Sequence, residues 1–429
     1  MGLVNIKAMT SHPSYKWYVL LLLVLIYIFG AVDRGVVAVI TEPLKNEFDL
    51  SDSEIGILGG LAYSVPFALF VLPMGWLVDR VNRRVLLSAT VTVWSMCTAV
   101  SAFAGNYYHL IAARMGVGVA EAPASPASLS LLADTFPVSL RSTAVGIYYA
   151  GAAVGQFLIF VVGGWILLTH SWREVFLVAG IPGLILAALL FFTTREPERG
   201  AMDRASGKAE IVKSNSDKTS ITSSLRDIFL DHPLRNALLA NTFSTGVQYS
   251  LMVWLTSFLV RLHDLSVTEA ALWVGVGIGV SQSLGSLVIG PIADRYTAGD
   301  PSKLARIPAI ATFVTVFAGV LMALAPSLSW AVTGMVLVGL MAGFFVATGY
   351  SLILSLADPD VRGTTLATGK LISILVGGGL IPFLTGFVSD LVGGSDSLRP
   401  AILATVSLHL LASFLFFRAG FHAKKITNE

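Results

Sequence analysis

Five charged residues lie inside long apolar stretches of the sequence, far from any polar segment: Asp33, Arg34, Arg114, Glu121 and Lys370. A charged side chain at the centre of a membrane helix costs roughly 2.5–3.5 kcal/mol, so such residues pair with one another, line water or take up a proton. Carboxyl groups can carry protons, and the arginine fork binds carboxylate or phosphate bidentately. These residue types indicate proton and anion binding within a membrane rather than covalent catalysis.

The depths of Asp33 and Arg114 predict that the two side chains meet. Asp33 lies seven residues before the expected end of one apolar run, and Arg114 lies seven residues after the start of another. At 1.5 Å per residue, both lie about 10 Å below the same membrane surface. Asp33 and Arg34 point about 100° apart, so they cannot face the same partner.

Glu121 lies two helical turns beyond Arg114, about 10 Å deeper and too far away for a direct bond. We expect no other cation beside it, so burial favours its neutral, protonated form. Pro123 removes the helical hydrogen bond to the carbonyl of Val119, which predicts a bent or hydrated helix beside Glu121. We therefore predict that Asp33 and Glu121 carry protons.

The two arginines are the predicted anion-binding groups. Arg114 and Arg34 would move between these carboxylates and an anionic substrate as protons bind and leave. Lys370, about 12 Å from the near end of its helix, either attracts a phosphate or extends its charge to the surface. Further side chains at expected cavity positions complete the predicted substrate site: Tyr63, Gln156, Asn241, Gln248, Phe344 and Tyr350.

The elements that must position these residues are membrane-spanning helices. Of the 429 residues, 55% are hydrophobic and 13% are charged, about half the charged share of a soluble domain. A helix needs about 20 apolar residues to cross a bilayer. We predict an all-α membrane protein with twelve transmembrane helices in two pseudo-symmetric six-helix bundles. The expected spans are 17–41, 53–77, 84–104, 107–133, 142–168, 173–193, 236–260, 267–293, 305–325, 329–356, 361–388 and 400–420.

The positions of the basic residues predict the orientation of the chain. Alternating loops place most of the 28 Lys and Arg residues on one side and leave Lys45, Arg173, Arg261 and Arg399 on the other. Cytoplasmic loops carry the excess of Lys and Arg, so both termini are expected in the cytoplasm. The long polar stretch 195–235 is then a cytoplasmic linker.

The two halves that this linker joins, 1–194 and 236–429, share short motifs. G-W-L-V-D-R at 75–80 ends the second span, and G-P-I-A-D-R at 290–295 ends the eighth. Two repeated halves are typical of alternating-access transporters, whose ligand site lies between the halves near the midplane. The sequence therefore predicts an N-terminal bundle, a linker and a C-terminal bundle.

Charged residues at the cytoplasmic ends of the spans are predicted to form a gate. A carboxylate near a helix N-terminus gains about 0.3–1 kcal/mol, so Asp79 and Asp294 can each meet a helix start in the opposite half. We expect Arg80 and Arg84 to bridge to acids such as Asp134. The predicted gate residues are Asp79, Arg80, Arg84, Asp134, Asp294, Arg295 and Asp358.

With these motifs in place, the sequence resembles the major facilitator superfamily over essentially its whole length. The stretch G-W-L-V-D-R-V-N-R-R at 75–84 is similar to the signature of that family between helices 2 and 3. Asn82 stands where the family usually has glycine, a tolerable change because asparagine also accepts positive φ. The resemblance implies a transporter that works by alternating access.

Within that superfamily the chain is most similar to the Spinster family and resembles a bacterial homologue of it. The residues that carry this likeness are Asp33-Arg34, R-M-G-V-G-V-A-E-A at 114–122 and W-R-E-V-F at 172–176. The resemblance implies proton-linked transport of a lysolipid or a sphingosine-phosphate-like amphiphile across a bacterial inner membrane. The alternative is a proton-coupled symporter of a small organic anion, such as a sugar acid, with a polar cavity.

Composition and motifs exclude other classes of function. The net charge of +2 gives no bias towards nucleic acid, and the single cysteine leaves no zinc-like Cys/His spacing. Without a nucleophile motif or a P-loop, the sequence predicts neither an enzyme nor a cofactor or metal site. Membrane charges of both signs and the repeated halves disfavour a channel. The expected partners are substrate, protons and membrane lipids, and the expected state is a monomer.

Overall fold

A computed structural model describes residues 14–200, 202, 230–358 and 362–428, and these residues form helices and connecting turns with no strand among them. Within them, eleven helical stretches are long and apolar enough to cross a membrane, which confirms the all-α membrane fold. The stretches are Tyr15–Phe48, Asp52–Val78, Arg83–Ser101, Ser139–Ile166, Trp172–Thr193, His232–His263, Val267–Thr297, Pro301–Ala323, Leu328–Leu356, Thr364–Val392 and Leu398–Ala423.

The remaining predicted span, 107–133, is broken into two shorter helices. α6 (Tyr107–Glu121) ends beside the proline, and α7 (Ala124–Thr135) begins after it. The break falls directly after Glu121, as Pro123 predicts. The carbonyl of Val119 is not left free, however, because it accepts the backbone N–H of Ala122 at 3.4 Å.

Polar side chains fix several helix starts. Asn82 caps α5 (Arg83–Ser101), accepting the N–H of Val85 at 2.9 Å, and its φ of −65° is not positive. The residue thus replaces glycine through its side chain rather than through a left-handed backbone. Ser171 and Glu174 form a reciprocal capping box at the start of α10 (Trp172–Thr193).

Short π-helical segments interrupt four of the described spans. They are η1 (Ile57–Leu61), η2 (Ile159–Gly163), η3 (Gly275–Val280) and η5 (Ser373–Leu380). Each inserts a residue into the helical ladder, so these are the points at which a span can bend.

The chain divides into two compact units. Among the described residues, unit 1 comprises 14–36, 65–162, 166–200 and 202, and unit 2 comprises 37–64, 163–165, 230–358 and 362–428. The predicted boundaries at 194 and 236 stay a prediction.

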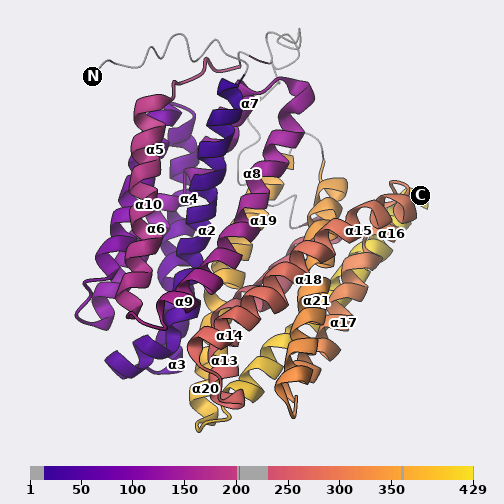
Figure 1. The fold of residues 1–429 in the computed structure, drawn as a ribbon. Coiled ribbons are helices and arrows are strands. Elements are labelled where there is room, and N and C mark those ends of the chain that lie inside the picture. The colour runs from indigo at the N-terminus through magenta and orange to yellow at the C-terminus, as the bar shows by residue number, and fades with distance from the viewer. Residues whose placement is uncertain (1–13, 201, 203–229, 359–361, 429) are drawn as a thin grey trace. The chain divides into compact units, whose positions relative to one another are not determined.

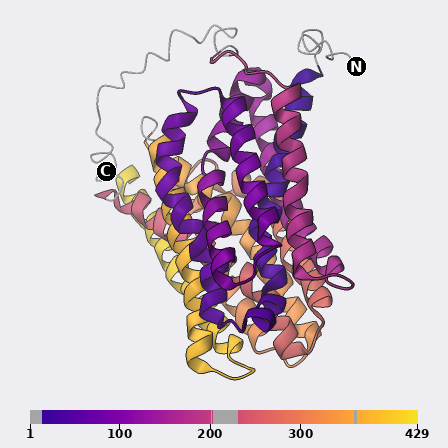
Figure 2. The same cartoon turned by 90° about the vertical axis from the view of Figure 1, so that its left-hand side faces the viewer.

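Unit 1 holds its helices together through small residues. α10 packs along α5, and the two views of Figures 1 and 2 show these helices running beside one another. α8 (Val138–Leu158) contacts α2 (Tyr15–Phe48) at Gly155, where an added Cβ would lie only 2.3 Å from the carbonyl oxygen of Ile28. Only glycine permits this approach.

Unit 2 is built around α13 (His232–His263). This helix packs against α21 (Leu398–Asn428), α18 (Leu328–Leu356) and η5. η1 packs against η5 as well, backbone against backbone. The buried core here is formed by residues such as Trp254 and Phe258.

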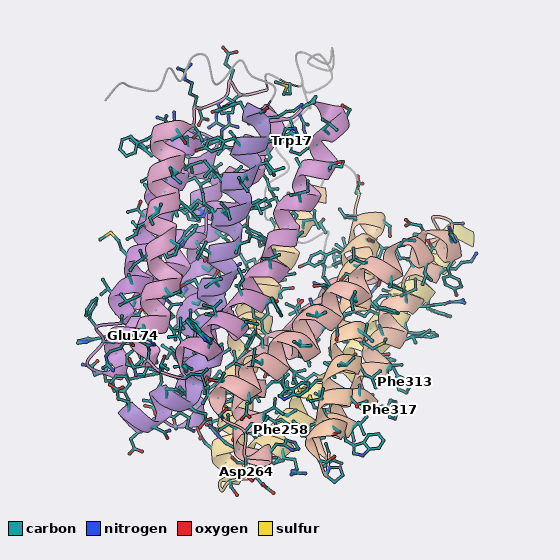
Figure 3. The ribbon with its side chains drawn as sticks, in the orientation of Figure 1. Trp17, Glu174, Phe258, Asp264, Phe313 and Phe317 are labelled. Carbon is teal, nitrogen blue, oxygen red and sulfur yellow. The ribbon has the colours of Figure 1, made fainter. Side chains whose placement is uncertain are left out.

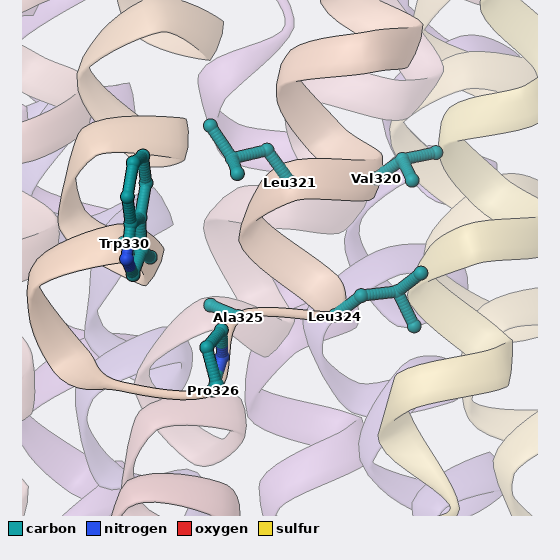
Figure 4. A pocket seen from close by; sticks show the side chains of 6 residues that line it. All are labelled: Val320, Leu321, Leu324, Ala325, Pro326 and Trp330. Carbon is teal, nitrogen blue, oxygen red and sulfur yellow. The ribbon is translucent and has the colours of Figure 1, made fainter.

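The surface of unit 2 carries large apolar side chains, as expected for contact with lipid tails. Phe313 and Phe317 of α17 (Arg306–Ala323) are 46% and 61% exposed and project from the helix in Figure 3. A small pocket lies at the turn between α17 and α18 (Figure 4). Its lining holds no titratable side chain, so it is not the candidate site: Val320, Leu321, Leu324, Ala325, Pro326 and Trp330.

Candidate functional site

Arg34 of α2 and Glu121 of α6 form an ion pair within unit 1. The Nη1 atom of Arg34 lies 2.6 Å from Oε2 of Glu121. The glutamate side chain is 3% exposed, whereas that of the arginine is 22% exposed. Gly30 makes room for the pair, since a Cβ there would lie 3.3 Å from the Glu121 carboxylate and 3.5 Å from the arginine.

This pair contradicts the expectation that no cation lies near Glu121. The depth of a residue along its helix axis takes no account of side-chain direction, and a helical side chain points towards the N-terminus of its own helix. Arg34 therefore reaches back along α2, towards the depth of Glu121 on α6. The long guanidinium side chain covers the remaining distance.

Asp33 and Arg114 form a second, more completely buried pair, which confirms the contact predicted from their equal depth. Two guanidinium nitrogens of Arg114 lie 3.1 and 3.2 Å from the two carboxylate oxygens of Asp33. The side chains are 2% and 3% exposed. Thr98 of α5 donates its hydroxyl to Asp33 and lies 3.2 Å from Arg114. The ring of Phe176 covers the guanidinium, 5.5 Å away.

The two pairs differ in what they can do chemically. The Asp33–Arg114 pair is bidentate, buried and supported by Thr98, which favours a tightly held contact. The proton-carrying role of Asp33 and the anion-binding role of Arg114 stay predictions. In the Arg34–Glu121 pair, a proton on the buried carboxyl would remove the negative partner of a guanidinium that already reaches the surface of the unit. An anion could then take the place of Glu121. Thr98 was not predicted, because a threonine within an apolar run carries no signal of its own.

The predicted substrate residues in unit 2 differ in burial and in hydrogen bonding. Gln248 of α13 already has a partner within the protein, because its amide nitrogen donates to the amide oxygen of Gln282 on α15 (Ser281–Thr297) at 2.6 Å. Asn241 is 2% exposed, and its contact with substrate stays a prediction. Tyr350 is 42% exposed and Lys370 is exposed.

The other predicted substrate residues are intermediate in burial. Phe344 and Tyr63 are half-buried in unit 2, and Gln156 is half-buried on α8 of unit 1. Their proposed contacts with substrate stay predictions.

The predicted gate partner of Asp134 is wrong. Asp134 pairs with Arg83, not with Arg80 or Arg84. Arg83 is 1% exposed and also bonds Glu196 at 2.6 Å. The reason is the turn at Asn82, which directs the first residue of α5 into unit 1.

Arg80 and Arg84 use other partners. The Arg80 guanidinium lies 4.0 Å from the Trp76 ring centroid and donates to the Trp76 carbonyl at 3.2 Å. Arg84 donates to the carbonyl of Thr194 at 2.8 Å, and its backbone N–H donates to Glu196 at 2.9 Å. The start of the linker is thus held against unit 1. The gate roles of Asp79, Asp294, Arg295 and Asp358 stay predictions.

A buried charge cluster in unit 2 was missed altogether. Asp52, 3% exposed, accepts hydrogen bonds from Arg261 at 2.9 Å, from Ser389 at 2.6 Å and from Lys45. Arg261 also bonds Glu42 at 2.9 Å. Lys45 and Arg261 were expected only as loop charges, and nothing in the local sequence links these distant positions.

Comparison with known proteins places this helical architecture in a family. The Major Facilitator Superfamily model matches residues 23–382. The chain is 27% identical to a bacterial homologue of the human lysosomal transporter Spinster, solved in an inward-facing and unoccupied conformation, with a TM-score of 0.87 and coverage of 97% of this chain and 99% of that one.

Two curated relatives are named for the acids that they carry. A gallate transporter of Pseudomonas putida is 28% identical over 96% of this chain and 93% of its own length. A probable L-galactonate transporter of Escherichia coli K12 is 24% identical over 86% of this chain and 82% of its own length. Because the family model covers most of the sequence, this multi-pass membrane protein is a transporter, not an enzyme, and it belongs to the Major Facilitator Superfamily.

Proposed function

We propose that the protein is a proton-coupled transporter that carries an organic anion by alternating access. The observation that carries this proposal is the Arg34–Glu121 pair, in which the Glu121 carboxylate is buried and the Arg34 guanidinium is partly exposed. A carboxylate that carries a proton needs a cationic partner whose charge another anion can balance once the carboxylate is neutral. Glu121 meets that requirement through Arg34.

Charge balance gives the order of events. With Glu121 ionised, the Arg34–Glu121 and Asp33–Arg114 pairs are each neutral, so both of these arginines already face a carboxylate. A proton on Glu121 leaves one positive charge at Arg34, and a monovalent anion restores neutrality. Leaving that charge uncompensated in the membrane would cost several kcal/mol, so proton and anion favour each other's binding.

The anionic group is a carboxylate or a phosphate, since the arginine fork suits both. A small organic acid is the first candidate, supported by the similarity to relatives that are named as galactonate and gallate transporters. A lysolipid is the second candidate, the substrate class implied by the likeness to the Spinster family. We further propose that the protein lies in a bacterial inner membrane with both termini in the cytoplasm. The two D-R motifs, Asp79-Arg80 and Asp294-Arg295, would form the gate.

Flux into proteoliposomes under an imposed pH gradient tests the proposal. Galactonate and a lysophospholipid serve as competing substrates, so the same preparation separates the two substrate candidates. Glu121→Gln should still bind substrate but lose the response to the gradient. Glu174→Gln is the matched control, because Glu174 caps α10 by bonding Ser171 and belongs to neither ion pair. Full gradient-driven flux through the Glu121→Gln variant would overturn the proposal.

A further inference from the structure

Three tyrosines pack together beside Arg34 in unit 1. Tyr27 of α2 stacks on Tyr148 of α8, with ring centroids 4.4 Å apart and planes inclined by 29°. Tyr149 meets Tyr27 edge to face at 5.8 Å and Tyr148 at 5.4 Å. The Arg34 guanidinium carbon lies 5.9 Å from the Tyr27 ring centroid. The guanidinium of Arg34 is therefore bordered by the Tyr27 ring, on which the other two tyrosines pack.

Close contact between α2 and α8 holds this aromatic group in place. Gly151 and Gly155 lie against Val24 and Ile28 of α2, with no side chain of their own between the helices. The faces of α2 and α8 that flank this contact therefore lie beside each other. The tyrosines come from these two helices, which makes their position relative to Arg34 a rigid property of unit 1.

The three rings differ in accessibility. Tyr148 is 1% exposed and serves as the buried base of the stack, whereas Tyr149 is 44% exposed. Gln156 follows Tyr149 by two turns on the same face of α8, and Ala153 between them is small and exposed. The exposed ring of Tyr149 therefore lies against Tyr27, the ring that borders Arg34, with a small residue and an amide farther along the same helix.

We propose that this group, with Tyr149 as its open face, recognises a carboxylate that is borne directly on a planar aromatic ring. The inference rests on the proposed function, since it makes Arg34 the partner of the carboxylate. The ring would then lie against Tyr149 and the edge of Tyr27. Aromatic pairs prefer offset or edge-to-face contacts with centroids about 4.5–7 Å apart, and the tyrosine rings themselves pack at 4.4 and 5.8 Å, one at the short end of that range and one within it.

Ring planarity is the property that this geometry selects. A saturated ring of the same size also buries apolar area, but it cannot stack on tyrosine through π faces. A polyhydroxy acid would leave hydroxyl groups against aromatic carbons, where they lose hydrogen bonds to water. The comparison of a planar and a saturated carboxylate therefore isolates the contribution of the rings.

Equilibrium binding to the purified full-length protein tests the proposal with three ligands: 4-hydroxybenzoate, cyclohexanecarboxylate and galactonate. The aromatic acid should bind about three- to tenfold more tightly than the saturated one. Tyr149→Leu should abolish that ratio, and Tyr149→Phe should keep it, because phenylalanine retains the π face. Leu168→Ala, at an exposed position beyond α8, is the control for a generally weakened protein.

Two results would overturn the aromatic site: equal affinity for the planar and saturated acids, or an unchanged ratio in the Tyr149→Leu variant. Either could occur while a pH gradient still drives galactonate or lysophospholipid flux, which would leave the proposed function standing. Conversely, tight binding of the aromatic acid with no response to a pH gradient would remove the proton coupling and keep the ring site.

Discussion

Arg34 and Glu121 share one ion pair but not one environment. The guanidinium is 22% exposed and the carboxylate 3% exposed, at a separation of 2.6 Å. In the neighbouring pair both Asp33 and Arg114 are buried. Unit 1 thus contains one pair that an incoming anion could compete for and one that supports the structure.

Replacing Arg34 by lysine should weaken substrate binding about tenfold or more, because an ammonium group cannot hold a carboxylate through two parallel bonds. Thermal stability should change little, since the arginine is partly exposed. Binding measured by calorimetry, with the melting temperature as a second readout, checks this. A lysine variant that binds like the parent would exclude Arg34 as the anion-binding group.

Replacing Asp33 by asparagine should destabilise the protein by about 3–5 kcal/mol, because it leaves the buried Arg114 without its counter-charge. The double variant Asp33→Asn with Arg114→Gln should recover part of that loss, since no buried charge remains. Denaturant or thermal unfolding in detergent measures both. If the single variant is as stable as the parent, the pair does not support the fold as described.

The substitution Arg83→Ala should cost several kcal/mol of stability, because it leaves Asp134 and Glu196 without their shared cation. Arg80→Ala should cost about 1 kcal/mol or less, because among the described residues that side chain makes its hydrogen bond and ring contact with the exposed Trp76. Parallel unfolding curves of the two variants provide the comparison. Equal effects would show that the two arginines do not differ as these contacts require.

The Asp52 cluster should be a stability determinant of unit 2. Asp52→Asn would leave Lys45 facing a neutral group and would remove one of the two carboxylate partners of Arg261. We expect a clear drop in melting temperature that changes little with salt, because buried ion pairs are only weakly screened. Asp49→Asn is the control, because Asp49 is exposed and its φ of 51° suits asparagine equally well. A drop of the same size in the control would contradict the importance of the cluster.

The contact between α8 and α2 should tolerate no larger residue at Gly155. A Cβ there would lie 2.3 Å from the carbonyl oxygen of Ile28, so Gly155→Val must push the helices apart. The tyrosine group and Arg34 would be displaced with them, and substrate binding should fall together with stability. Gly146→Val, where an added Cβ meets nothing within 4 Å, should leave both unchanged.

The sequence by itself determined the spans, the break in the fourth span and the contact between Asp33 and Arg114. These features depend on local arithmetic: the length of an apolar run, the missing N–H of Pro123, and a fixed rise per residue that sets depth in the membrane. Each of these quantities belongs to a single helix. The only further information that the Asp33–Arg114 contact required was that their two helices are neighbours.

Only the tertiary structure decided which partner each charge found. Arg34 reached Glu121 because its side chain points back along α2. Arg83, rather than Arg80 or Arg84, met Asp134. Depth fixes one coordinate of a side chain, but its direction around the helix and the identity of the facing helix follow from packing. The tyrosine group and the Asp52 cluster join residues more than a hundred positions apart, so no local sequence pattern predicts them.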